Sequence, residues 1–159
     1  MSDKKSADEI RKHMWKKLAS DRFVMAGLTG SSEHSEPMTA IVDEDADSEF
    51  WFYTSKTNRL APGGPAMVQY VSEDHKLFAC IKGRIVEETD EAVKDKYWSN
   101  MVEAWFEGGR NDPSLIMLRF ELDDAEIWEG DQTISGYFKM LTGKTIQPEE
   151  AGRHVETAL

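Results

Sequence analysis

Residues 50–65 (FWFYTSKTNRLAPGGP) gather side chains that could bind an anion. The hydroxyls of Thr54 and Ser55 follow an aromatic run, and the cationic side chains of Lys56 and Arg59 come shortly after them. Arginine carries a planar fork of N–H donors that matches phosphate oxygens, and hydroxyls supply further donors. These residue types therefore favour a phosphate or a similar anion as ligand.

The expected local structure would direct these donors to one point. Residues 49–54 have the pattern of a strand, and residues 56–61 have that of a short helix. A helix start leaves its first amides unpaired, here those of Ser55–Thr57, and the helix dipole makes that end positive. Arg59 would reach back over the same point because helical side chains lean toward the amino terminus. The alternative is an ordinary surface helix with a solvated arginine.

The composition indicates one globular domain. The chain has 159 residues, 40% apolar and 31% charged, with no run of about 18 apolar residues that could span a bilayer. The charged amino terminus does not resemble a secretion signal, and the net charge of −11 without a basic run argues against nucleic acid as a partner. We expect a cytoplasmic protein without a membrane partner, with a domain at residues 1–143 and a polar, poorly ordered tail at 144–159.

Helices are expected near both ends of a series of strands. Ser6 begins a capping box for a first helix, whose apolar face includes Ile10, Met14 and Leu18. Asp90 can cap a second helix that continues to the glycine pair at 108–109. A third, short helix is expected at residues 134–141.

Short apolar segments between turn residues predict the strands. They lie at residues 22–29, 38–42, 49–54, 67–71, 76–88 and 115–122, with 125–128 as an extension of the last. The strands at 38–42 and 49–54 are expected to form a hairpin. Successive strands with helices at the ends favour a β-rich α+β fold, in the form of an antiparallel barrel.

The sequence contains no pattern typical of a metal site or of acid–base catalysis. No histidine pair has ligand spacing, and the single cysteine, Cys80, cannot form an internal disulfide. No nucleophile elbow and no histidine–carboxylate set is visible. Any chemistry would therefore be that of a cofactor.

Two segments together resemble a known family. FWFYTSKTNR is similar to the phosphate-binding segment of the pyridoxamine-phosphate-oxidase-like FMN-binding split barrels, where an aromatic-Tyr-Thr run precedes Ser-Arg-Lys. Residues 97–128 (YWSNMVEAWFEGGRNDPSLIMLRFELDDAEIW) resemble the marker of the general stress protein branch, with its Gly-Gly-x-x-Asp-Pro turn and a strand ending in Glu-x-Trp. The segments lie in the family's order, and the similarity extends from about Ile10 to Gly143.

The resemblance implies a six-stranded antiparallel split β-barrel with flanking helices, which forms a homodimer and holds FMN between its subunits. By position, Tyr53 and Thr54 would line the ribityl-phosphate end of the flavin, and Arg59 would be the phosphate-binding arginine. The backbone of another strand would pass along the flavin ring, at Met38, Thr39, Ala40 and Ile41. An apolar wall with a few amide donors suits a flavin.

The chain departs from the family pattern at the expected phosphate site. Asn58-Arg59-Leu60 stands where the family has Ser-Arg-Lys, so one phosphate-binding cation is missing and Lys56 would have to replace it. Residues 36–42 also lack the arginine or lysine that many relatives carry on the ring-lining strand. The substrate residues of the true oxidases are unmatched, so pyridoxamine phosphate is not carried over as substrate.

Trp105 and Trp128 admit two roles. Aromatic side chains are common in dimer interfaces and beside planar ligands. The two tryptophans could pack in the core or in an interface, or they could contact the flavin from the partner subunit.

Our hypothesis from the sequence is an FMN-binding flavoprotein of the general stress type. It could act as a flavin reductase or oxidase on an unknown substrate, with NADH or NADPH as the electron donor. The alternatives are a flavin carrier or sensor without turnover, and a dimeric interaction module whose FMN binding has weakened.

Overall fold

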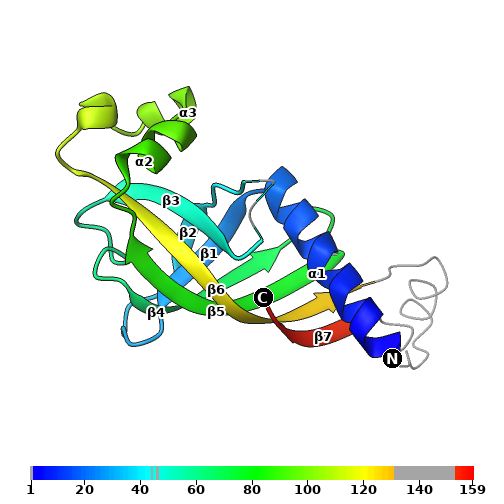
Figure 1. The fold of residues 1–159 in the computed structure, drawn as a ribbon. Coiled ribbons are helices and arrows are strands. Elements are labelled where there is room, and N and C mark those ends of the chain that lie inside the picture. Colours follow the sequence, from blue (N-terminus) through cyan, green and yellow to red (C-terminus); the bar gives the residue numbers. More distant parts are fainter. Residues whose placement is uncertain (1, 44, 46, 131–152) are drawn as a thin grey trace.

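The computed structural model describes residues 2–43, 45, 47–130 and 153–159, which form a curled sheet with helices around it (Figure 1). The described sheet has seven strands. Neighbouring strands pair antiparallel in the order β2-β1-β4-β5-β6-β3, with β7 also beside β6. The strands are β1 (Phe23–Leu28), β2 (Glu36–Thr39), β3 (Glu49–Ser55), β4 (Gly64–Val71), β5 (Leu77–Glu87), β6 (Leu115–Glu129) and β7 (Arg153–Ala158). The helices are α1 (Ser2–Ser20), α2 (Glu91–Tyr97), α3 (Asn100–Glu103) and a 3-10 turn (Gly109–Asn111).

The sheet is a barrel with a split between its two edge strands, β2 and β3. Among the described residues one bridge crosses the split: Ile41, just after β2, exchanges two backbone hydrogen bonds with Trp51 of β3, at 2.7 and 3.0 Å. The β-rich α+β class and the antiparallel split barrel are thereby confirmed. The predicted hairpin is wrong apart from this bridge, because β2 pairs with β1 and β3 pairs with β6.

Alternation of apolar and polar side chains explains the strands. Along β5, Leu77, Ala79, Ile81 and Ile85 are buried, while Phe78, Lys82 and Arg84 face outward. This period of two is what a strand with one covered face requires. The predicted strands at 22–29, 67–71, 76–88 and 115–122 are confirmed as β1, β4, β5 and the first half of β6.

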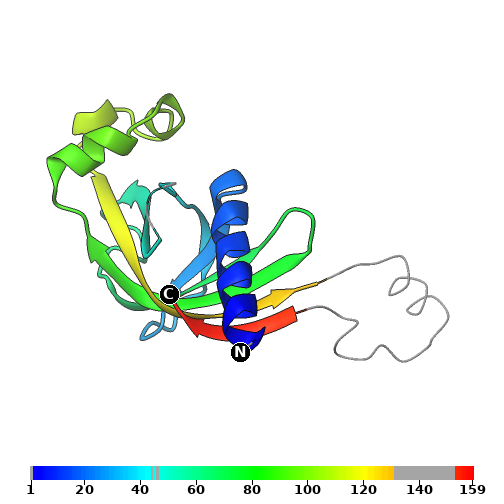
Figure 2. The same cartoon turned by 45° about the vertical axis from the view of Figure 1, so that its right-hand side comes forward.

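Helix α1 lies against the curled sheet and covers the core (Figure 2). Its predicted apolar face is confirmed, since Ile10, Met14 and Leu18 are fully buried. Burying one such side chain contributes roughly 1.5–3 kcal/mol. The predicted start is wrong: the helix begins at Ser2, and Ser6 lies inside it.

The segment after β5 is not one helix. Asp90 caps α2 as predicted, accepting a hydrogen bond from the Ala92 amide at 2.9 Å. Trp98, however, has an extended backbone and ends α2, and Ser99 caps the separate helix α3. Neither helix contains a buried residue, and both project from the barrel (Figures 1 and 2). The single helix predicted from Asp90 to the glycine pair at 108–109 is therefore wrong beyond Tyr97.

The carboxyl-terminal residues contain a strand that the sequence did not indicate. Residues 153–158 form β7, in which Val155 pairs with Ile127 of β6 and packs against the core. The prediction of a poorly ordered tail is wrong for these residues, because they pair with the edge of β6 and because Val155 and Leu159 pack against the core. The helix predicted at 134–141 and the domain boundary at 143 lie outside the described residues.

The close approach of β5 to β6 requires a glycine at position 83. The register between these strands shifts between Lys82 and Gly83. A Cβ atom on Gly83 would lie 2.1 Å from the Glu121 carbonyl oxygen and 2.9 Å from the Phe120 ring. No side chain larger than hydrogen fits without moving the backbone of β6.

Replacement of Gly83 by alanine is expected to lower the free energy of unfolding by about 1–3 kcal/mol, because the methyl group overpacks this strand crossing. Gly30→Ala is the matched control, since no atom lies within 4 Å of a Cβ at that position. Urea unfolding followed by tryptophan fluorescence measures both variants. Equal midpoints for the two variants would contradict the explanation.

Candidate functional site

The predicted phosphate segment and the predicted ring-lining strand meet at the split. The Asn58 side-chain amide donates to the Glu36 carboxylate at 2.6 Å, and the Arg59 guanidinium forms an ion pair with the same carboxylate at 3.2 Å. Arg59 also donates to the backbone carbonyl of His34 at 2.8 Å. The turn after β3 is thus joined to the start of β2, two residues before Met38.

Residues 56–62 form turns instead of the predicted helix. The Lys56 amide donates to the Ser114 carbonyl at 2.8 Å, and the Thr57 amide donates to the Ser55 hydroxyl at 3.2 Å. The prediction of unpaired amides at a helix start is therefore wrong for Lys56 and Thr57. Serine competes with helix formation by bonding to nearby amides, and the buried Leu60 side chain draws the turn into the core.

Hydroxyl groups and one cation remain available at this turn. The Ser55 and Thr57 hydroxyls lie 2.9 Å apart, and Thr54 is half-buried just before them. Lys56 is exposed, and its ammonium group has no hydrogen bond or ion pair within the described part of the chain. These donors have the chemistry that an anion needs.

Arg59 does not reach back over Ser55 as predicted. Its guanidinium is held by Glu36 and His34, on the side of the turn that faces β2. The paired carboxylate offsets the positive charge, and a phosphate at Arg59 would compete with Glu36 or share the guanidinium with it. The side chain remains 38% exposed, so solvent and ligands can reach it.

The predicted ring-lining residues lie at an open edge of the sheet. Met38 is half-buried and pairs with Val24 of β1, while Thr39 is exposed. Ala40 is fully buried, and Ile41 makes the bridge to Trp51. Apart from that bridge, no described strand pairs with the outer edge of β2. Backbone groups on such an edge are available to an incoming ligand.

The Tyr53 side chain helps to hold helix α2 in place. Its hydroxyl donates to the Lys94 carbonyl, and its ring meets Trp98 edge-on at 5.5 Å between centroids. Burial raises the pKa of Tyr53 to about 12, so the hydroxyl stays protonated at neutral pH. The aromatic ring, more than the hydroxyl, is what Tyr53 can offer to a ligand.

Within one chain, the two predicted tryptophans do not lie with the other predicted flavin-binding residues. Trp105 is 86% exposed at the end of the projecting α3 segment. Trp128 stacks on His154 of β7, with ring centroids 5.1 Å apart. It lies eleven residues along β6 from Met117, the partner of Tyr53, which corresponds to roughly 36 Å of extended strand.

Glu88 is a positioning residue that the sequence did not reveal. It is 6% exposed and accepts hydrogen bonds from the Trp51 indole at 3.0 Å and from Arg119 at 2.9 Å. The same carboxylate accepts from the Asp90 amide at 3.4 Å, so it links β3 and β6 to the start of α2. Burial acts to raise the pKa of Glu88, but the bonds from Trp51 and Arg119 outweigh it and hold that pKa below its ordinary value.

Asp43 anchors the other end of α2. The Tyr97 hydroxyl donates to this carboxylate, and Lys96 forms an ion pair with it at 3.1 Å. Tyr97 hydrogen bonding is the largest cause that lowers the pKa of Asp43 to about 2. The Tyr97 ring also stacks on Trp51, with centroids 4.8 Å apart. Helix α2 is therefore fixed against β3 at both ends.

The chain belongs to the pyridoxamine 5'-phosphate oxidase like family, whose sequence model matches residues 8–149. This confirms the resemblance seen in the two sequence segments. No curated protein sequence matches the chain. No helix in the described ranges is long and apolar enough to cross a membrane.

Solved structures of general stress proteins share the fold. The general stress FMN/FAD binding protein of Xanthomonas citri is 41% identical, with a TM-score of 0.73 over 80% of this chain and 93% of that chain. A protein assigned to the general stress family in Xanthomonas campestris pv. campestris is 42% identical, with a TM-score of 0.73 over 80% and 91%. One assigned as general stress protein 26 in Jannaschia sp. CCS1 is 28% identical, with a TM-score of 0.77 over 96% and 99%.

Glu88→Gln is expected to cost about 1.5–3 kcal/mol of stability at pH 7, because the bonds from Trp51 and Arg119 lose their charged acceptor. The pKa of Glu88 is depressed by folding, so its contribution is present above about pH 4.5 and is lost as the pH falls below that value. The gap between wild type and variant should therefore narrow on acidification. The urea midpoints of wild type and variant at pH 7 and pH 4 measure this gap in stability.

The exposed neighbour Glu87 provides the control for this experiment. Glu87→Gln should leave the unfolding midpoint at pH 7 almost unchanged. A gap between Glu88→Gln and wild type that stays constant with pH would show that the carboxylate charge is not what stabilises the junction.

Proposed function

We propose that the protein is a cytoplasmic, homodimeric FMN-binding flavoprotein of the general stress type, with its flavin site at the split between β2 and β3. The observation that supports this most is the contact of Asn58 and Arg59 with Glu36, which brings the expected phosphate turn beside the expected ring-lining strand. Membership of the family and the similarity to a general stress FMN/FAD binding protein support the same cofactor.

In this proposal the phosphate of FMN binds at the turn after β3. The Ser55 and Thr57 hydroxyls would donate to its oxygens, and the exposed Lys56 would supply the charge that is missing at position 60. Arg59 would contribute to phosphate binding only to the extent that its guanidinium gives up the ion pair with Glu36. The Leu60 side chain is fully buried and would only support the turn from below.

The ring end of the flavin would lie along the open edge of β2, at residues 38–41. Met38 and Ile41 are half-buried there and offer apolar contact, and the strand edge offers backbone donors and acceptors. The Tyr53 ring would close the site from the β3 side. Its position depends on α2, because its hydroxyl is bonded to the Lys94 carbonyl.

Exposed apolar side chains support a second copy of the chain as the partner. Met101 and Trp105 are 78% and 86% exposed on the projecting α2–α3 segment, and single domains seldom display such residues together without a function. Val71, Phe78 and Trp128, which stand opposite one another on β4, β5 and β6, are also exposed. A homodimer would cover apolar surface of this kind and could bring Trp105 to the flavin of its partner.

FMN supplies hydride and electron transfer when it is bound, and the chain supplies binding and orientation. An oxidoreductase that uses NADH or NADPH and a carrier without turnover would share the site. Anaerobic mixing of the FMN-loaded protein with NADH or NADPH separates them, because rapid loss of flavin absorbance at 450 nm requires reduction. We favour the oxidoreductase, since the split leaves the predicted ring edge open to a second molecule.

Added FMN is expected to bind at micromolar concentration, with quenching of flavin fluorescence as the ring leaves water. Binding to the folded state alone should raise the melting temperature by several degrees at saturation. Fluorescence titration and a thermal scan check both effects. An unquenched flavin together with an unchanged melting temperature would contradict the proposal.

Arg59→Ala is expected to weaken FMN binding by about tenfold or more, because a charge-assisted phosphate contact is lost. Glu36→Gln should strengthen binding, because it releases the guanidinium from its carboxylate partner. Arg84→Ala, at an exposed position on β5, is the matched control and should bind as wild type does. If neither Arg59→Ala nor Glu36→Gln changes the affinity, the phosphate binds without Arg59.

A further inference from the structure

The carboxylate of Glu36 occupies the donors that the sequence assigns to a phosphate. Its Oε1 accepts a hydrogen bond from the Asn58 side-chain amide at 2.6 Å, and its Oε2 lies 3.2 Å from Nε of Arg59. Asn58 and Arg59 are two of the three residues at the expected phosphate-binding triplet, and the third, Leu60, is fully buried. A phosphate would use this turn in the same way, with one oxygen on each donor.

Both donors are held in place by bonds that do not involve Glu36. Oδ1 of Asn58 accepts from the Leu60 amide at 2.8 Å, which directs the nitrogen end of that side chain toward β2. The Arg59 guanidinium donates through Nη1 to the His34 carbonyl at 2.8 Å. The two donors would therefore stay at the turn if the Glu36 carboxylate left them.

The Glu36 carboxylate can leave without a change in the sheet. Glu36 is the first residue of β2, and its backbone is paired with Ala26 of β1. Within the described ranges, Asn58 and Arg59 are the only partners of its carboxylate, and the side chain is 21% exposed. Rotation of this one side chain into solvent is enough to free both donors.

The balance of charge at the turn makes such an exchange favourable for a phosphate. A phosphate monoester carries about −1.5 to −2 charges at pH 7. The turn offers the cations of Lys56 and Arg59, and Glu36 cancels one of them. A phosphate that shared the guanidinium with Glu36 would lie close to a like charge, and this repulsion ends when the carboxylate turns away.

We propose that Glu36 is an internal competitor for the phosphate of FMN, and that the phosphate displaces its carboxylate from Asn58 and Arg59. This inference rests on the proposed flavin site and adds the residue that tunes its affinity for the phosphate. Glu36 then weakens the binding of FMN. It does not affect riboflavin, which has the same ring and ribityl chain without the phosphate. In the absence of FMN, Glu36 keeps the charge of Arg59 paired.

Fluorescence titrations of the full-length protein with FMN and with riboflavin test the competition. Glu36→Gln retains an oxygen acceptor and removes the charge, so it should bind FMN about tenfold more tightly than wild type. Its affinity for riboflavin should equal that of wild type. Glu33→Gln is the matched control, because it removes the same charge from an exposed position three residues earlier. It should change the affinity for FMN by less than about twofold.

The displacement itself has a signature in the NMR spectrum. The Nε–H signal of Arg59 and the side-chain amide signals of Asn58 should shift when FMN saturates the wild-type protein, because both groups exchange Glu36 for the phosphate. Riboflavin should leave these signals in place. Inorganic phosphate should shift them in Glu36→Gln at about tenfold lower concentration than in wild type.

The proposal is overturned if Glu36→Gln and Glu33→Gln have the same affinity for FMN. It is also overturned if riboflavin gains as much affinity as FMN, because Glu36 would then act on the strand and not on the phosphate. Unmoved Arg59 and Asn58 signals at saturating FMN would overturn it as well. All three results are obtained with FMN bound, so they leave the flavin site intact. Absence of FMN binding to wild type and Glu36→Gln alike would instead remove the flavin site and this proposal together.

Discussion

Trp51 is the point on which the arrangement of the split depends. Its backbone makes the only described bridge across the two edge strands, to Ile41. Its indole N–H donates to the buried Glu88, and its ring stacks on Tyr97 of α2. One residue thus sets how closely β2 approaches β3 and where the projecting helices begin. Loss of the bond to Glu88 or of the stacking on Tyr97 would loosen the other, because both are made by one rigid aromatic side chain.

The barrel has an aromatic core and one open seam. Phe50, Phe52 and Phe120 occupy the interior with ring centroids 5.2 to 5.6 Å apart, and α1 adds Met14 and Leu18. β2 has only four residues and pairs with β1 along its inner edge. Both edges therefore keep backbone groups that no described strand pairs, which is the opening that a planar ligand needs.

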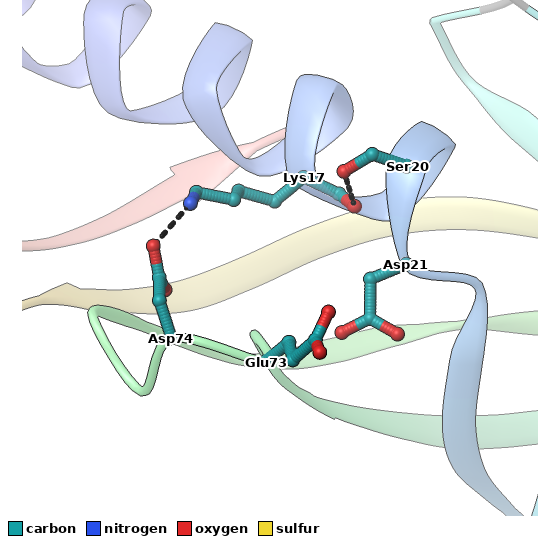
Figure 3. Close-up of a pocket in the computed structure, with 5 residues that line it drawn as sticks. All are labelled: Lys17, Ser20, Asp21, Glu73 and Asp74. Atoms are coloured by element: carbon teal, nitrogen blue, oxygen red, sulfur yellow. Dashed lines mark hydrogen bonds and ion pairs between the residues drawn. The ribbon is translucent and has the colours of Figure 1, made fainter.

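Charge is distributed so that few cations remain for an anion. The protein carries a net charge of −11, and the ion pairs Arg59–Glu36, Arg119–Glu88 and Lys17–Asp74 each use one cation. Lys56 stands apart from these pairs, at the turn where hydroxyls gather. Carboxylates outnumber cations at the end of α1, where Asp21, Glu73 and Asp74 line a hollow together with Lys17 (Figure 3). The turn after β3 therefore keeps a cation that an anionic ligand could use.

The sequence by itself determined the strands β1, β4, β5 and β6, the apolar face of α1, the Asp90 cap and the family. These features depend on local periodicity and on short sequence motifs. Both can be recognised without knowing which distant residues they contact. Only the tertiary structure decided the partners of those segments: Arg59 is bonded to Glu36, Glu88 is buried below Trp51, and residues 153–158 complete the sheet as β7. The predicted helix after Thr54 failed for the same reason. The Lys56 amide finds the carbonyl of Ser114, which is far away in sequence and becomes a neighbour only when β3 pairs with β6.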